Sequence, residues 1–147
     1  MQQWNKRTTI FKKFQVEMAH KLVTDYPTPC NRLHGHSYTI ELGIIGDGLD
    51  NNGMICDFTK LKLFVNQIKD IFDHKTLIYD PDILKSDTHD AAITKVNYNP
   101  TAENMAEDIA RRLLKYIDSD LEISIRGVIV SVNETQNNKA VVQIDVE

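Results

Sequence analysis

A thiol and two imidazoles lie within seven residues of one another, at Cys30, His34 and His36. If residues 34–38 form a strand, His34 and His36 point to the same face, because strand side chains alternate with a period of two. Two neutral imidazoles on one strand can bind one metal ion, and a third ligand would complete a zinc site with an open position. A lone His-Gly-His motif is weak evidence, so the rest of the chain must supply the third ligand.

A third histidine, His20, ends a row of apolar residues at alternate positions. Phe14, Val16 and Met18 share its parity, which predicts a strand within Thr8–Leu22 that has one buried face. Two interpretations of His20 stay open. Taken alone, such a histidine is more often a core residue bonded to the backbone, whereas beside two other histidines it is a candidate ligand.

The thiol is expected in a loop. Pro27 and Pro29 cannot donate to a sheet and restrict their neighbours, so residues 24–33 are predicted to be irregular. A loop thiol near a metal and a base is suited to nucleophile or base chemistry, which makes Cys30 a candidate catalytic residue. The second cysteine, Cys56, ends a short apolar segment and is interpreted as a packing residue.

An amphipathic helix is predicted to begin near Phe58, capped by Asp57, and to carry one apolar stripe over four turns. The stripe comprises Leu61, Phe64, Val65, Ile68, Ile71 and Phe72. Asp73 and His74 follow its last apolar turn, where their side chains can point into a cleft. A carboxylate and an imidazole in that place could orient and activate a thiol.

A second helix is predicted after Pro100. Thr101 would cap it, and Glu103 lies in its first turn, where the helix dipole favours an anion. Residues 79–100, between the two helices, are predicted to be a long connection with a short extended piece at 93–96. His89 lies in this connection and is not expected to be functional.

Two strands are predicted in the last quarter of the chain, joined by a turn at residues 135–138. Gly127 in the first of them would allow a bulge or a close approach. Glu134 ends an otherwise apolar row in this strand. It is either a solvated rim residue or a buried anchor for a ligand rich in N–H groups.

The predicted order is strand, strand, helix, helix, strand, strand. It favours a single α+β domain over residues 1–147, with two helices on one face of a four-stranded antiparallel sheet. The other face of the sheet also carries apolar residues, which indicates that another subunit covers it.

Composition excludes some classes of function. The net charge of −4 gives no basic footprint for nucleic acid. No apolar run approaches the roughly 20 residues that span a bilayer, and the N-terminus lacks a signal peptide's apolar core. Two cysteines without a Cys-x-x-Cys pair favour a cytoplasmic protein with free thiols.

Together these residues predict a zinc lyase or isomerase that acts on a polyhydroxylated heterocycle. His20, His34 and His36 would hold Zn²⁺, which acts as a Lewis acid toward substrate oxygens. Cys30 would act as a base, and Glu134 would hold a guanidine-like edge of the substrate.

Six motifs in this order resemble the 6-pyruvoyl-tetrahydropterin synthase family, and most closely its 6-carboxy-tetrahydropterin synthases of queuosine biosynthesis, known as QueD. The resemblance runs from Phe11 to Val146. The motifs are Glu17-Met18-Ala19-His20, Cys30 to Tyr38, Gly53 to Phe58, Phe72-Asp73-His74, Pro100 to Asn104, and Glu134-Thr135 before Asn137-Asn138.

The resemblance implies a set of site residues. These are zinc ligands His20, His34 and His36, a catalytic triad of Cys30, Asp73 and His74, and pterin-binding residues Glu134, Thr101 and Glu103. It also implies the tunnelling fold, with sheets that join into a barrel in trimers or hexamers. Active sites would lie between subunits, so Asp73 and His74 would complete the Cys30 site of a neighbour.

The implied reaction turns 7,8-dihydroneopterin triphosphate into 6-carboxy-5,6,7,8-tetrahydropterin, acetaldehyde and triphosphate. Three residues separate Cys30 from His34, as in QueD-type enzymes, whereas animal-type pyruvoyl synthases generally have a longer gap. A 6-pyruvoyl-tetrahydropterin synthase remains the nearest alternative. A non-catalytic zinc or pterin-binding protein is a third interpretation, which the Cys30, Asp73 and His74 set argues against.

Overall fold

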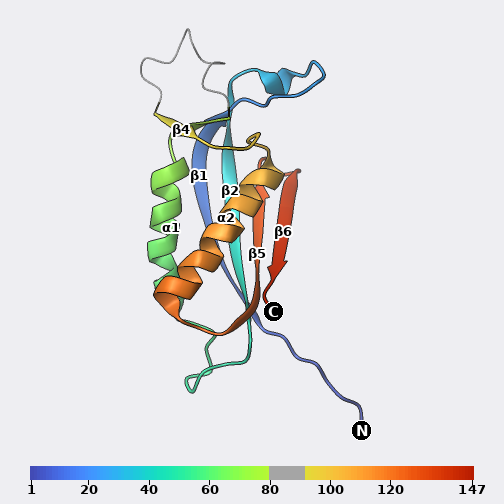
Figure 1. Cartoon of the computed structure of the whole chain (residues 1–147), viewed down its shortest axis with the longest axis vertical. Helices are drawn as coiled ribbons and strands as arrows, with labels where there is room; N and C mark the ends of the chain where they lie inside the picture. The colour runs from blue at the N-terminus through green and yellow to red at the C-terminus, as the bar shows by residue number, and fades with distance from the viewer. Residues whose placement is uncertain (80–91) are drawn as a thin grey trace.

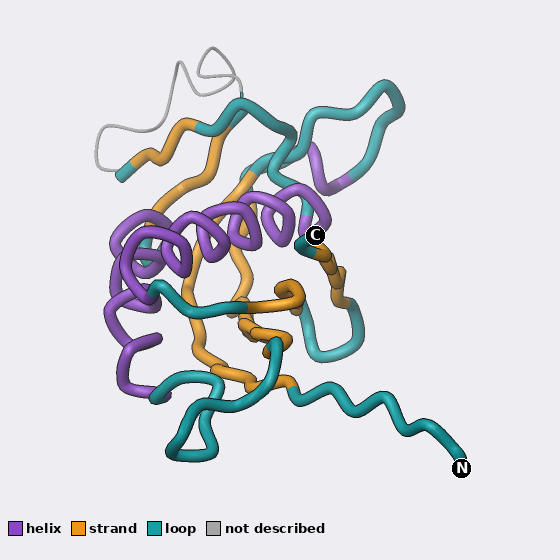
Figure 2. Tube along the Cα trace, turned by 60° about the horizontal axis from the view of Figure 1, so that its bottom comes forward, coloured by secondary structure: helices purple, strands orange, loops and turns teal. Residues whose placement is uncertain are grey.

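The computed structural model describes residues 1–79 and 92–147, which form a sheet with two helices packed against one face (Figure 1). The first eight residues form no helix or strand and extend away from the body of the fold (Figures 1 and 2). The elements in chain order are β1 (Thr9–His20), β2 (His34–Gly46), α1 (Phe58–Phe72), β3 (Lys75–Ile78), β4 (Ile93–Lys95), α2 (Ala102–Tyr116), β5 (Ile125–Asn133) and β6 (Lys139–Asp145).

The sheet has six strands in the order β4-β3-β1-β2-β5-β6, so the prediction of four strands was wrong. The strands β1, β2, β5 and β6 pair antiparallel, whereas β3 lies parallel to both β1 and β4. The sheet is therefore mixed, and its two additional strands lie beyond β1 at one edge.

The two missed strands lack a sequence pattern that would reveal them. In β3, Thr76, Leu77 and Ile78 are all buried, so the strand shows no alternation of apolar and polar residues. The three-residue β4 falls within the predicted extended piece at 93–96 but is too short to identify as a strand. His89 lies outside the described residues.

The core lies between the helices and the even-numbered side chains of β1 and β2. Val16, Tyr38, Ile40, Leu42 and Ile44 are fully buried there, in one cluster with apolar side chains of both helices. Burial of each aliphatic side chain of this size contributes about 1.5–3 kcal/mol. Cys56 is buried in the same core, as predicted.

The opposite face of the sheet carries apolar side chains, as the sequence indicated, together with polar ones. Its centre forms a pocket of about 460 Å³ lined by polar side chains that include Lys13, Thr39, Glu41 and Ser131. Exposed apolar side chains on this face include Phe11 and Val141. The odd-numbered positions of four strands supply this surface, and the histidines lie on the other side.

Neither α1 nor α2 is long and apolar enough to cross a membrane, and the described residues hold no other helix that could.

Candidate metal centre and active site

Strand register brings the three histidines together at one end of the sheet. His20, the last residue of β1, pairs directly with His34, the first residue of β2, and His36 pairs with Met18. All three side chains share the parity of the core residues, and their ring centroids lie 4.5, 4.8 and 5.2 Å apart.

Main-chain carbonyl groups fix the orientation of two of these rings. The His20 Nδ1 atom lies 2.7 Å from the Pro100 carbonyl oxygen, and the His34 Nδ1 atom lies 2.6 Å from that of Arg32. Because a carbonyl only accepts, each Nδ1 carries the proton and each Nε2 presents a lone pair. The two Nε2 atoms are 3.0 Å apart, so two acceptors face each other, which a cation between them would stabilise.

The carboxylate of Glu134 completes the cluster. Its Oε1 atom lies 3.1 Å from His20 Nε2 and 2.9 Å from His36 Nε2. One ligand atom from each of the four residues lies within 4.8 Å of the others, so this group could hold a metal ion. Three imidazole nitrogens and a carboxylate oxygen are donors that zinc accepts.

The electrostatics of the site favour the neutral forms of His20 and His36, and neutral imidazole is the form that binds metal. Burial lowers the pKa of His20, although the Pro100 carbonyl opposes this effect. Burial also lowers the pKa of His36 against the opposing charge of Glu134. The hydroxyl group of Tyr38 lies 3.2 and 3.3 Å from the His20 ring nitrogens, and burial raises the pKa of that phenol.

Asp73 and His74 form a pair at the turn between α1 and β3. The His74 Nδ1 atom lies 3.2 Å from Asp73 Oδ1, and His74 has a positive φ of 57°. Glu17 of β1 holds the turn through its main chain, because its N–H donates to Asp73 Oδ1 at 2.8 Å and its carbonyl accepts from His74 N–H at 2.6 Å. Burial disfavours the charged carboxyl of Asp73, but the hydrogen bonds from Glu17 and His74 hold its pKa below the ordinary value.

Cys30 is exposed on a short 3-10 helix, Pro29–Asn31. Thr28 caps this helix by accepting the Cys30 N–H at 3.3 Å, and the Cys30 carbonyl accepts from Leu22 N–H at 3.0 Å. The turn that carries the thiol is thereby tied to the chain two residues beyond His20.

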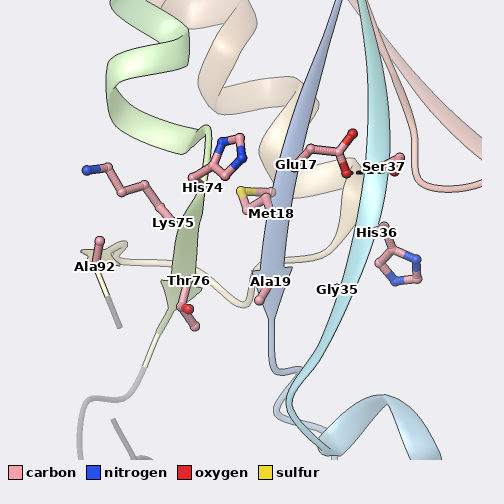
Figure 3. Close-up of a pocket in the computed structure, with 10 residues that line it drawn as sticks. All are labelled: Glu17, Met18, Ala19, Gly35, His36, Ser37, His74, Lys75, Thr76 and Ala92. Carbon is pink, nitrogen blue, oxygen red and sulfur yellow. Dashed lines mark hydrogen bonds between the residues drawn. The ribbon is translucent and has the colours of Figure 1, made fainter. Parts of the chain in front are cut away.

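Figure 3 shows a pocket lined by His74, which precedes β3, and by residues of β1 and β2. The volume of this pocket is about 490 Å³. His74 and His36 both line it from opposite sides of β1, together with Glu17 and Ser37, whose hydroxyl donates to the Glu17 carboxylate at 2.6 Å. Cys30 is not among the described residues that line this pocket. One chain therefore assembles the histidine cluster and the Asp-His pair, but does not bring Cys30 into the pocket that holds His74.

The two other predicted pterin contacts lie at the start of α2. Thr101 caps this helix by accepting the Asn104 N–H at 3.2 Å, and Glu103 is exposed in the first turn. The contacts of Thr101 are those of a helix cap. Its neighbour Pro100 has the direct link to the site, through the carbonyl that holds His20.

Several supporting groups were missed from the sequence. Pro100, Arg32 and Glu17 act through main-chain atoms, which a pattern of side-chain types does not reveal. Tyr38 had a usable signal, since it follows His36 by two residues and therefore lies on the same face of β2.

The model of the 6-pyruvoyl tetrahydropterin synthase family matches residues 9–145, which includes every element described above. The chain belongs to this family. Relatives of this synthase family include a Bacillus subtilis protein named 6-carboxy-5,6,7,8-tetrahydropterin synthase, which is 30% identical over 88% of this chain and 81% of its own. A Haemophilus influenzae protein of the same name is 31% identical over 81% of this chain and 88% of its own.

Solved structures of the synthase family share the fold. The 6-pyruvoyl tetrahydropterin synthase of Plasmodium falciparum superposes with a TM-score of 0.78 at 20% identity, over 97% of this chain and all of the other. That of Caenorhabditis elegans superposes with a TM-score of 0.64 at 22% identity, over 97% of each chain. The α+β layout of the tunnelling fold is thus confirmed, with six strands in this chain.

Proposed function

We propose that this protein is a zinc-dependent 6-carboxy-5,6,7,8-tetrahydropterin synthase. It converts 7,8-dihydroneopterin triphosphate into 6-carboxytetrahydropterin, acetaldehyde and triphosphate, a step in the synthesis of queuosine and related 7-deazapurines. The observation that carries the proposal is the convergence of the His20 and His34 Nε2 lone pairs at 3.0 Å, in a chain whose named relatives carry this activity.

His20, His34 and His36 would hold the zinc ion. When bound, the ion supplies Lewis acidity toward hydroxyl and carbonyl oxygens of the substrate side chain. The Pro100 and Arg32 carbonyls fix two of these rings, so the lone pairs are aligned before metal or substrate enters.

Cys30 would move protons at the substrate side chain, with Asp73 and His74 as its partners. The contact with Asp73 orients the exposed His74 ring, and the main chain of Glu17 holds the Asp73 carboxylate and the His74 N–H. Since Cys30 is exposed and does not line the pocket of His74, the triad is proposed to form between two subunits of a trimer or hexamer.

Glu134, Thr101 and Glu103 are proposed to bind the pterin. A carboxylate can accept two parallel N–H bonds from a guanidine-like edge. Glu134 is suited to this role because its side chain remains partly exposed at the rim of the histidine cluster.

A 6-pyruvoyl-tetrahydropterin synthase is the second candidate. The description of the matching family model and the names of the Plasmodium and Caenorhabditis structures favour it. Both reactions use the same substrate and release triphosphate, so they differ in the carbon side chain of the product.

The proposal is tested by following consumption of 7,8-dihydroneopterin triphosphate by purified protein. We expect turnover that stops after removal of metal by a chelator and returns with zinc. Cys30→Ala and His74→Ala should each lose turnover, whereas Glu107→Ala, which removes a partly exposed carboxylate paired with Arg111 on α2, should retain it. Wild-type rates for both site variants would overturn the catalytic assignment.

A further inference from the structure

Glu134 has a second possible partner besides the substrate, and that partner is the histidine cluster itself. Its Oε1 atom lies within 3.1 Å of two histidine Nε2 atoms. Ligands of a tetrahedral zinc ion, each about 2.0–2.1 Å from the metal, lie about 3.3 Å from one another. The spacing between Glu134 and the histidines is therefore close to that of ligands of one shared ion.

An ordinary hydrogen bond does not explain the short contact with His36. The His36 Nε2 atom is buried and makes no hydrogen bond among the described residues, although Glu134 Oε1 is only 2.9 Å away. Since this distance is within hydrogen-bond range, the oxygen does not have the alignment with the ring that a hydrogen bond at Nε2 requires. An oxygen beside a nitrogen, rather than in front of it, is the arrangement of two ligands directed at a common third atom.

The position of Glu134 also allows its side chain to leave the cluster. The main chain is held at the β5–β6 turn, where Glu134 N–H donates to the Asn138 carbonyl at 3.1 Å. The carboxylate is 27% exposed, whereas the His20 side chain is 1% exposed. Rotation of this partly exposed side chain, with the backbone in place, would move the carboxylate from the cluster toward solvent.

We infer that Glu134 is an exchangeable fourth ligand of the metal. In the substrate-free protein its carboxylate closes the His20, His34 and His36 site. Substrate displaces the carboxylate, which then accepts N–H groups of the pterin. The inference rests on the proposed function, because it assigns two successive partners to a residue of that site.

The test measures zinc affinity of the substrate-free protein by competition with a chromophoric chelator. We expect Glu134→Gln to bind zinc at least about 10-fold more weakly than wild type, on the scale seen when groups that support metal ligands are removed. The matched control, Glu107→Gln, removes a carboxylate from a surface ion pair with Arg111 and should bind zinc as wild type does.

A second readout uses Co²⁺ in place of zinc. The absorption bands of the Co²⁺ protein should shift when dihydroneopterin triphosphate is added to wild type, and the bands of Glu134→Gln should differ from wild type before addition. If wild type and Glu134→Gln share one zinc affinity and one Co²⁺ spectrum, while His34→Ala binds neither ion, only the exchange is overturned. If wild type binds no zinc, the proposed function fails with it.

Discussion

The main-chain N–H of Glu17 donates a 2.8 Å hydrogen bond to the carboxylate of Asp73, 56 residues further along the chain. Glu17 lies three residues before His20 on β1, and its carbonyl accepts the N–H of His74. The strand that positions a metal ligand thus also positions the Asp-His pair. A single strand, β1, therefore positions both the histidine cluster and the Asp-His pair.

Asp73→Asn should separate catalysis from folding. The amide keeps an oxygen that can accept the Glu17 N–H but loses the negative charge beside the His74 ring. We expect kcat to fall by about 10²–10⁴-fold, the usual contribution of acid–base catalysis, with zinc content unchanged. Asp70→Asn, at an exposed site on α1, should leave the rate unaltered. A wild-type rate for Asp73→Asn would exclude the pair from the reaction.

The backbone of His74 offers a stability test that is independent of the chemistry. Its φ of 57° is in the left-handed region, which disfavours residues with a Cβ by about 1–2 kcal/mol. Chemical denaturation should therefore show His74→Gly to be more stable than His74→Ala, although both variants lose the imidazole. The opposite order would mean that the turn relaxes out of this conformation.

Gly127 illustrates a close approach that was anticipated from the sequence. A Cβ at this position would lie 2.5 Å from the Ile144 carbonyl oxygen, a backbone atom of the paired strand β6. Gly127→Ala should lower the free energy of unfolding by about 1–3 kcal/mol, the usual penalty of overpacking. At Gly35 the nearest atom to a new Cβ is 3.5 Å away, so Gly35→Ala should be tolerated. Equal stabilities for these variants would contradict the close packing of β5 on β6.

The metal-free protein should lose stability in mild acid. Burial lowers the pKa of His20 and His36 below the ordinary 6.5, so the unfolded chain takes up protons first as the pH falls. The stability that these two neutral histidines contribute is complete above their pKa in the unfolded chain. It is lost as the pH falls through their lower pKa in the folded protein. Denaturation midpoints measured from about pH 8 to about pH 5 should decline. His36→Gln should reduce the slope of midpoint against pH. An unchanged slope would show that protonation of His36 does not destabilise the folded protein.

The sequence predicted the position of the three histidines better than it predicted the edge of the sheet. Strand parity placed His20, His34 and His36 on the face where they meet, and both helices begin where their caps indicated. The pairing of β3 with β1 could not be predicted, because parallel pairing of a buried four-residue strand depends on tertiary contacts. The contact of Glu134 with the histidines likewise depends on the register of β5 against β2.

The identity of the two-carbon product tests the central claim most directly. Zinc-loaded protein is incubated with 7,8-dihydroneopterin triphosphate, and acetaldehyde is trapped and compared with the triphosphate released. A 6-carboxytetrahydropterin synthase predicts one acetaldehyde per triphosphate, together with a 6-carboxy pterin. Release of triphosphate without acetaldehyde, and with a 6-pyruvoyl pterin, would contradict the proposed function.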